Sequence, residues 1–167
     1  LNNIAMNSQI ASKRVLVTGC CGTVGSELVH SLLALPDGPC EVVGIDNNES
    51  ALFMKGIEER HDSRARFRLC DIRDAGALRD VMDGIDIVIH AAALKHVTIC
   101  EEAPAQAAAV NITGLQNVLD TASGCNVERV VVTSSDKAVH PNSVMGLTKL
   151  LGERMTSAAN GKRRNCR

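Results

Sequence analysis

The chain has 167 residues, a length that fits one domain, and its 45% hydrophobic and 22% charged content is typical of a globular protein with a buried core. A net charge of −1 argues against nucleic acid as a partner. The sequence also lacks a run of about 18 apolar residues, which a membrane-spanning helix would need. Tyrosine and tryptophan are absent, which excludes any mechanism that needs a tyrosine of these residues.

The seven cysteines are odd in number and show no C-x-x-C spacing. They indicate small core residues in a reducing compartment, so we expect a cytoplasmic protein without a metal site. The adjacent residues Cys20 and Cys21 lie in a glycine-rich turn, where a redox switch is the alternative to simple substitution for small residues.

Three regions are predicted along the chain: a flexible polar leader at 1–12, a folded domain at 13–158 and a basic tail at 159–167. Strands are predicted at 14–18, 41–46, 66–70, 85–91 and 127–134. Helices are predicted at 25–35, 49–60, 74–81 and 143–158, with a long alanine-rich helix that ends near Ser123. The strand centres are apolar throughout instead of alternating, which is typical of parallel strands covered on both faces. We therefore expect an α/β fold with a doubly wound, Rossmann-like parallel sheet in three αβα layers.

The turn after the first strand has the spacing G-x-x-G-x-x-G and opens a helix. The residues concerned are Gly19, Gly22, Thr23, Val24 and Gly25. Such a turn brings backbone N–H groups to a pyrophosphate at the positive end of the helix dipole, although a tight βα turn needs glycine in any case. Asp46 ends the second strand, where its carboxylate would accept both hydroxyls of an adenosine ribose and repel a 2′-phosphate. This pattern favours NAD over NADP, and the alternative for Asp46 is a turn or cap residue.

Further candidates follow the third and fourth strands. Asp71, with Ile72 beside it, would contact the adenine edge of the cofactor, or Asp71 would cap the next helix. The small side chains of Ala91, Ala92 and Ala93 would let the cofactor lie against the backbone at the carboxyl edge of the sheet.

Three polar residues come next in the chain. Lys95 and His96 lie near the same crevice, either in structural roles or in contact with cofactor or substrate. Asn111 is a poor helix former inside an alanine-rich helix, so we expect it to hold a local bulge or contact a neighbouring strand and thereby position the site.

The stretch after the last strand combines an acid, two lysines and hydroxyls. Its candidate residues are Ser134, Ser135, Asp136, Lys137, Met145 and Lys149. Such a set is typical of a catalytic site. The alternatives are that Asp136 and Lys137 form an exposed pair that neutralises itself, and that Met145 is ordinary core packing.

Taken together, these blocks resemble the nucleotide-sugar 4,6-dehydratases of the extended short-chain dehydrogenase/reductase family, in particular the UDP-N-acetylglucosamine type of polysaccharide biosynthesis. The resemblance is to the N-terminal portion and covers about residues 13 to 155. It rests on the glycine turn, Asp46 and the blocks at 70–74, 90–97, 111–114, 134–138 and 145–149.

The resemblance implies hydride transfer from sugar carbon four to NAD, elimination of water across carbons five and six, and return of the hydride at carbon six. Asp136 would protonate the departing 6-hydroxyl and Lys137 would remove the carbon-five proton. Lys149 would hold the nicotinamide ribose, and Ser134 or Ser135 would bind the 4-hydroxyl. Met145 stands where most of the superfamily has a tyrosine, so the base for the 4-hydroxyl is unassigned.

The resemblance also implies a C-terminal substrate-binding region, for which the sequence after residue 158 gives no strand signal. Two other functions therefore stay open: an NAD-binding module without turnover, and a nucleotide-sugar epimerase. We expect a UDP-sugar as the small-molecule partner and a homo-oligomer as the assembly.

Overall fold

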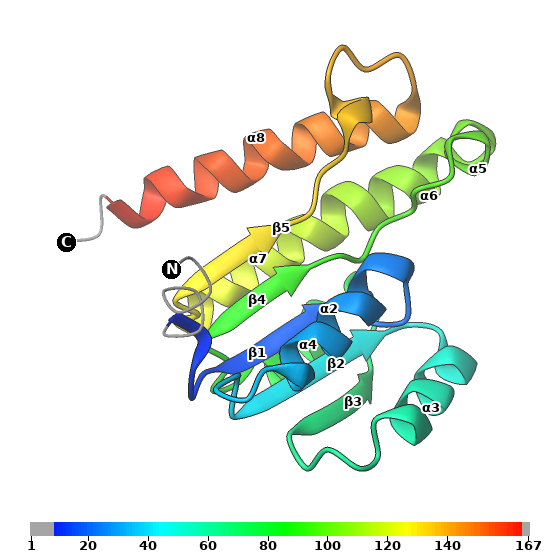
Figure 1. Cartoon of the computed structure of the whole chain (residues 1–167). Helices are drawn as coiled ribbons and strands as arrows, with labels where there is room; N and C mark the ends of the chain where they lie inside the picture. Colours follow the sequence, from blue (N-terminus) through cyan, green and yellow to red (C-terminus); the bar gives the residue numbers. More distant parts are fainter. Residues whose placement is uncertain (1–8, 165–167) are drawn as a thin grey trace.

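The sheet of this protein has five parallel strands in the order β3-β2-β1-β4-β5, in a computed structural model that describes residues 9–164 (Figure 1). The strands are β1 Arg14–Thr18, β2 Glu41–Asp46, β3 Ala65–Leu69, β4 Ile87–His90 and β5 Arg129–Val132. The doubly wound α/β fold predicted from the sequence is confirmed, and β1 and β2 have the predicted bounds.

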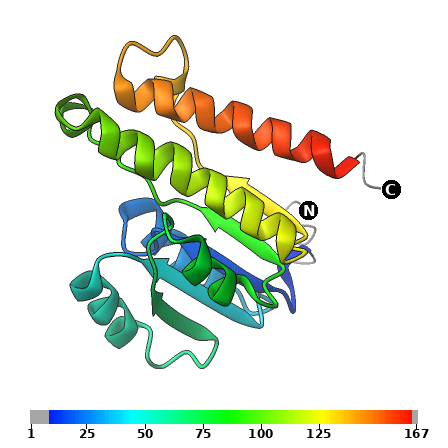
Figure 2. The same ribbon diagram turned by 180° about the vertical axis from the view of Figure 1, so that it is seen from behind.

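Helices cover both faces of this sheet. They are α2 Thr23–Ala34, α3 Glu49–Glu58, α4 Ala75–Met82, α5 Val97–Glu102, α6 Pro104–Ala108, the π-helix η1 Ala109–Gly114, α7 Leu115–Gly124, the 3-10 turn η2 Asp136–Ala138 and α8 Val144–Arg164. Helices α2 and α3 lie on one face, and α4 and α7 lie on the other (Figure 2). Within residues 9–164, no helix is long and apolar enough to cross a membrane.

Two apolar cores result, because successive residues of a strand point to opposite faces. Val15 and Val17 of β1 pack on the α2 side, whereas Leu16 packs on the α4 and α7 side. All three side chains have no exposed surface. The continuous apolar runs read from the sequence therefore serve a sheet that is buried on both sides.

The predicted long alanine-rich helix is confirmed as the continuous helical run of α6, η1 and α7, which ends at Gly124, and α5 is a separate short helix before it. Pro104 has no N–H and restricts the residue before it, so α5 ends at Glu102, Ala103 is non-helical, and α6 begins with proline at its first position. The bulge predicted at Asn111 is confirmed, since this buried residue lies in the π-helix η1.

The last helix is longer than predicted. Helix α8 continues to Arg164 instead of ending at residue 158, so most of the predicted basic tail is helical. Residues 165–167 of that tail, and residues 1–8 of the predicted leader, lie outside the described part of the chain.

The two edge strands differ in character. In β3 the exposed positions include Arg66 and Arg68, whereas β5 is three valines after one arginine, and Val131 is 46% exposed. Strand β5 pairs with β4 and with no other strand of the described residues.

Candidate functional site

The glycine turn joins β1 to α2 and touches the segment that follows β4. Gly19 has a positive φ of 68°, and a Cβ built there would lie 2.7 Å from the Ala92 backbone. A Cβ at Gly25 would overlap the Gly19 carbonyl. Only glycine therefore allows this close approach of three backbone segments.

The N-terminus of α2 is open to an anion. Its N-cap residue is Gly22, and no side chain caps the first turn, which also contains no acidic residue. The N–H groups of that turn and the helix dipole therefore favour a negatively charged group, such as a phosphate, at this point.

A cavity of about 210 Å³ lies over this turn at the carboxyl ends of β1 to β4. It is lined by Gly19, Gly22, Thr23, Val24, Gly25, Ile45, Asp46, Asn47, Cys70, Asp71, Ile72, Ala91, Ala92, Ala93, Leu94, Lys95 and Val110. The structure thus brings together all the predicted cofactor-binding residues except Asn111 and Lys149. Their distribution over four strand ends is what a doubly wound sheet produces.

The carboxylate of Asp46 is fixed at the end of β2. One of its oxygens accepts a hydrogen bond from the Cys21 N–H and the other from the Asn48 N–H, both at 3.0 Å. A carboxylate oxygen has more than one lone pair, so both keep acceptor capacity toward the cavity.

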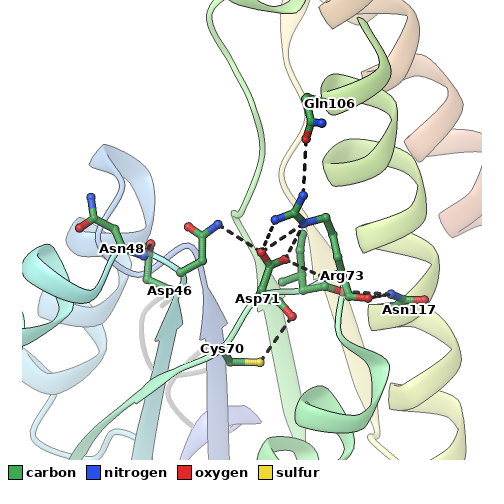
Figure 3. Close-up of polar contacts among 9 residues, drawn as sticks. Asp46, Asn48, Cys70, Asp71, Arg73, Gln106 and Asn117 are labelled. Carbon is green, nitrogen blue, oxygen red and sulfur yellow. Dashed lines mark hydrogen bonds and ion pairs between the residues drawn. The ribbon is translucent and has the colours of Figure 1, made fainter. Parts of the chain in front are cut away.

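Asp71 is paired with Arg73 on the neighbouring wall (Figure 3). The guanidinium donates to both carboxylate oxygens, with contacts of 3.0 and 2.6 Å, and lies 3.5 Å from the Gln106 amide oxygen. Hydrogen bonds from Arg73, and to a lesser degree from Asn47, lower the pKa of Asp71 to about 2. The alternative that Asp71 caps the next helix is wrong, because the Asp74 side chain caps α4.

Lys95 and Asn111 hold the segment after β4. The Lys95 ammonium lies 3.3 Å from the Thr23 hydroxyl, across the mouth of the glycine turn. The Asn111 side chain accepts from the Leu94 N–H and donates to the Leu94 carbonyl and the Thr148 hydroxyl. Asn111 thus ties this segment to α8, which agrees with the positioning role predicted for it.

A second, larger hollow of about 1330 Å³ lies between α7, β5 and α8. It shares Ala92 and Ala93 with the first cavity, so the two are adjoining. Lys149 and Ser134 also line it, and the Lys149 ammonium donates to the Thr133 carbonyl at 3.1 Å. Burial lowers the pKa of Lys149. The Ser134 hydroxyl donates to Glu153.

Sequence reasoning assigned no role to the buried pair Thr18 and His90. The Thr18 hydroxyl oxygen accepts from the Ala92 N–H at 3.2 Å and forms a second hydrogen bond, at 2.8 Å, with Nδ1 of His90. Burial, with a smaller effect of the Lys149 charge, lowers the pKa of His90 to about 4. The ring is therefore neutral at pH 7, and its hydrogen bond with Thr18 joins the ends of β1 and β4.

Asp136 and Lys137 lie apart from both cavities. Their side chains are 88% and 51% exposed, and the carboxylate and ammonium are 3.6 Å apart. A hydrogen bond from the Ser135 hydroxyl, followed by the Lys137 charge, lowers the pKa of Asp136. This exposed pair matches the alternative stated for it, and its catalytic role stays a prediction.

Two other predicted residues also lie outside the cavities. Met145 is buried in a small apolar cluster with Cys100 and Ala107, as its packing alternative expects. His96 is the residue before α5, without a side-chain cap. Their roles in catalysis and substrate binding stay predictions.

Comparison with known proteins places the chain in context. A family model described as "Polysaccharide biosynthesis protein" matches residues 15–167. An uncharacterised membrane protein of Methanocaldococcus jannaschii is 43% identical over 91% of this chain and 46% of its own length. A UDP-glucose 4-epimerase of Rickettsia typhi is 34% identical over 87% of this chain and 43% of its own.

A solved structure is similar as well. The dTDP-glucose 4,6-dehydratase DesIV of Streptomyces venezuelae, determined as a double mutant with NAD bound, matches with a TM-score of 0.80 and 32% identity over 87% of this chain and 51% of its own. The chain therefore spans about half the length of the proteins it matches.

Proposed function

The chain belongs to the polysaccharide biosynthesis protein family, and on that premise we propose that it supplies the NAD-binding residues of a nucleotide-sugar 4,6-dehydratase that acts on a UDP-N-acetylhexosamine. The observation that carries this proposal is the cavity between the glycine turn and Asp46, where an uncapped helix N-terminus and a fixed carboxylate lie at neighbouring strand ends.

These residues fit the two ends of an ADP-ribose. The N–H groups at the start of α2 would hold the pyrophosphate, because Gly19 and Gly25 allow the close backbone packing that forms this tight turn. Asp46 would accept the ribose hydroxyls, and its charge would exclude a 2′-phosphate. When bound, NAD supplies the hydride acceptor for carbon four of the sugar.

The adjoining cavities give the cofactor a continuous path. Ala92 and Ala93 line both of them, and their methyl groups leave the backbone accessible. The nicotinamide end would lie in the larger hollow, where the partly buried Lys149 would donate to its ribose hydroxyls. The bond from Lys149 to the Thr133 carbonyl already directs the ammonium along β5.

The elimination step is assigned to the exposed pair. Asp136 would give a proton to the departing 6-hydroxyl and Lys137 would take the proton from carbon five. The Ser135 hydrogen bond and the Lys137 charge favour the ionised carboxylate in the present arrangement. A sugar that covers the pair and excludes water would raise the pKa of Asp136 and prepare it as an acid.

A nucleotide-sugar epimerase is the second candidate, and the Rickettsia typhi relative, named UDP-glucose 4-epimerase, favours it. Epimerisation at carbon four needs no acid and base for loss of water. A module that binds NAD without turnover is the third candidate.

Native mass spectrometry of the chain with NAD and UDP-N-acetylglucosamine tests these candidates. We expect one retained NAD, with loss of water from the sugar if the dehydratase is complete in this chain. A carbon-four epimer, which has the mass of the substrate and is therefore identified by NMR of the released sugar nucleotide, would favour the epimerase, and NAD retention without any change of the sugar would favour the binding module. A chain that retains no NAD would contradict the proposal.

Asp46→Asn is the matching variant, with Asp37→Asn as control, since Asp37 is exposed beyond the other end of α2. Loss of the Asp46 charge should weaken the binding of NAD and strengthen the binding of NADP relative to that of NAD, because the repulsion of a 2′-phosphate is removed. The control should leave both unchanged. Equal preference for NAD in all three proteins would remove Asp46 from the proposed cofactor site.

A further inference from the structure

Two thiols lie close to the carboxylate of Asp46, which lines the first cavity, and the proposed function uses only the carboxylate. The Sγ atoms of Cys20 and Cys21 are 3.9 Å apart. Each lies within 4.8 Å of a carboxylate oxygen of Asp46. No other group of three such ligands occurs among residues 9–164.

The spacing of the two sulfur atoms suits chelation of one ion. Zinc–sulfur bonds of about 2.3 Å at tetrahedral angles place two thiolates about 3.8 Å apart. The observed separation of 3.9 Å needs almost no adjustment. A carboxylate oxygen is a common third ligand of zinc, and Asp46 is already oriented by two backbone N–H groups.

The sheet makes room for this group. Cys20 is fully buried, and a Cβ built at Gly44 on β2 would lie 2.9 Å from its Sγ atom. The absence of a side chain at Gly44 therefore provides the space that the Cys20 sulfur occupies. Cys21 and Asp46 are partly buried, and Asp46 lines the cavity, so an ion can approach from that side and keep a water as fourth ligand.

We propose that Cys20, Cys21 and Asp46 bind a thiophilic divalent ion of the zinc class, and that this ion excludes NAD because both need the Asp46 carboxylate. The second half of the proposal rests on the proposed function, whereas the ion site does not. In the absence of an ion both thiols keep their protons, since burial raises the pKa of Cys20 and of Cys21. Binding releases two protons and leaves the oxidation state of both sulfur atoms unchanged, so affinity rises with pH.

Geometry disfavours a disulfide between the same two residues. Neighbouring Cα atoms are about 3.8 Å apart across a trans peptide, which is shorter than the roughly 4.4–6.8 Å that disulfides span. Coordination of an ion needs no such distortion of the turn.

The test uses Cd²⁺ as a spectroscopic probe of the intact chain and of two variants. Cys21→Ser removes one ligand, and Cys125→Ser is the control, because Cys125 is also partly buried but follows α7 and is not part of the group with Asp46. Thiolate-to-Cd²⁺ charge-transfer absorption is titrated first, and NAD binding is then measured at rising Cd²⁺ and Zn²⁺ concentrations. Thermal unfolding of the ion-free proteins verifies that both variants fold.

We expect the wild type and Cys125→Ser to bind one Cd²⁺ tightly, and Cys21→Ser to bind it at least about tenfold more weakly, because even outer-shell partners of a metal site are worth 10–100-fold in affinity. The apparent Kd for NAD should rise with the Cd²⁺ concentration in the first two proteins only. Equal Cd²⁺ affinity in a folded Cys21→Ser variant would overturn the ion site. NAD binding that is unaffected by saturating Cd²⁺ would overturn the exclusion. If no protein binds NAD, the proposed function fails, and the absorption titration still decides the ion site.

Discussion

Replacing Thr18 by valine should destabilise the protein far more than the loss of one oxygen atom suggests. Thr18 has no exposed surface, and its hydroxyl serves both the Ala92 N–H and Nδ1 of His90. In the valine variant the buried His90 and the partly buried Ala92 N–H both lose this partner. A buried group without its partner costs about 1–3 kcal/mol and the partly buried N–H lies at the low end of that range, so we expect a loss of about 2–4 kcal/mol. That is a large part of the roughly 5–15 kcal/mol that stabilises a domain.

Urea unfolding followed by circular dichroism measures this loss. With a slope of about 1–3 kcal/mol per molar urea, the midpoint should fall by about 1–2 M while the slope stays constant. Thr18→Ser is the matched control, because it keeps the hydroxyl and loses only a methyl group, which is worth about 1 kcal/mol. If the valine variant is no less stable than the serine variant, the buried hydrogen bonds do not have the role assigned to them.

Three further predictions concern His90, Gly19 and Asp136. The free energy of unfolding should fall by about 3 kcal/mol in total as the pH is lowered from about 6.5 toward 4, because residue 90 is protonated there in the unfolded state, whereas native His90, with a pKa of about 4, is not. Urea titrations at several pH values measure this dependence, and the His90→Gln variant should lose it. An unchanged pH dependence in that variant would contradict the assignment to His90. Gly19→Ala should lower the free energy of unfolding by at least about 1 kcal/mol and abolish NAD retention. The control Gly56→Ala, with no atom near its new Cβ, should stabilise α3 by about 0.5–1 kcal/mol. Similar effects of the two changes on thermal unfolding would count against the strain at Gly19. Asp136→Asn should leave NAD retention and stability unchanged and abolish water loss in any preparation that turns over, and continued dehydration would remove Asp136 as the acid.

Local patterns predicted most of the fold. The strands β1 and β2 were predicted to the residue, because their apolar runs are bounded by charged residues and followed by turn residues. The division at Pro104 was available in the sequence, since proline ends the helix before it, but the alanine-rich composition around it favoured one long helix.

The parts of the site that sequence missed depend on register between distant strands. Thr18 and His90 are partners because β1 and β4 are neighbours in the sheet and these two residues are paired in register, although 72 positions separate them in the chain. The group of Cys20, Cys21 and Asp46 likewise forms only when β1 and β2 end side by side. Spacing rules for metal ligands describe local motifs and do not detect such a group.

The two edges of the sheet differ in how readily a further strand can pair with them. Arginines on β3 place charge where another strand would have to pair, so that edge resists addition of a strand. The valine edge of β5 carries no such charge beyond Arg129 and has no strand on its outer side among residues 9–164. Within the described residues the sheet can therefore be extended in one direction only, because a further strand fits beside β5 and is disfavoured beside β3.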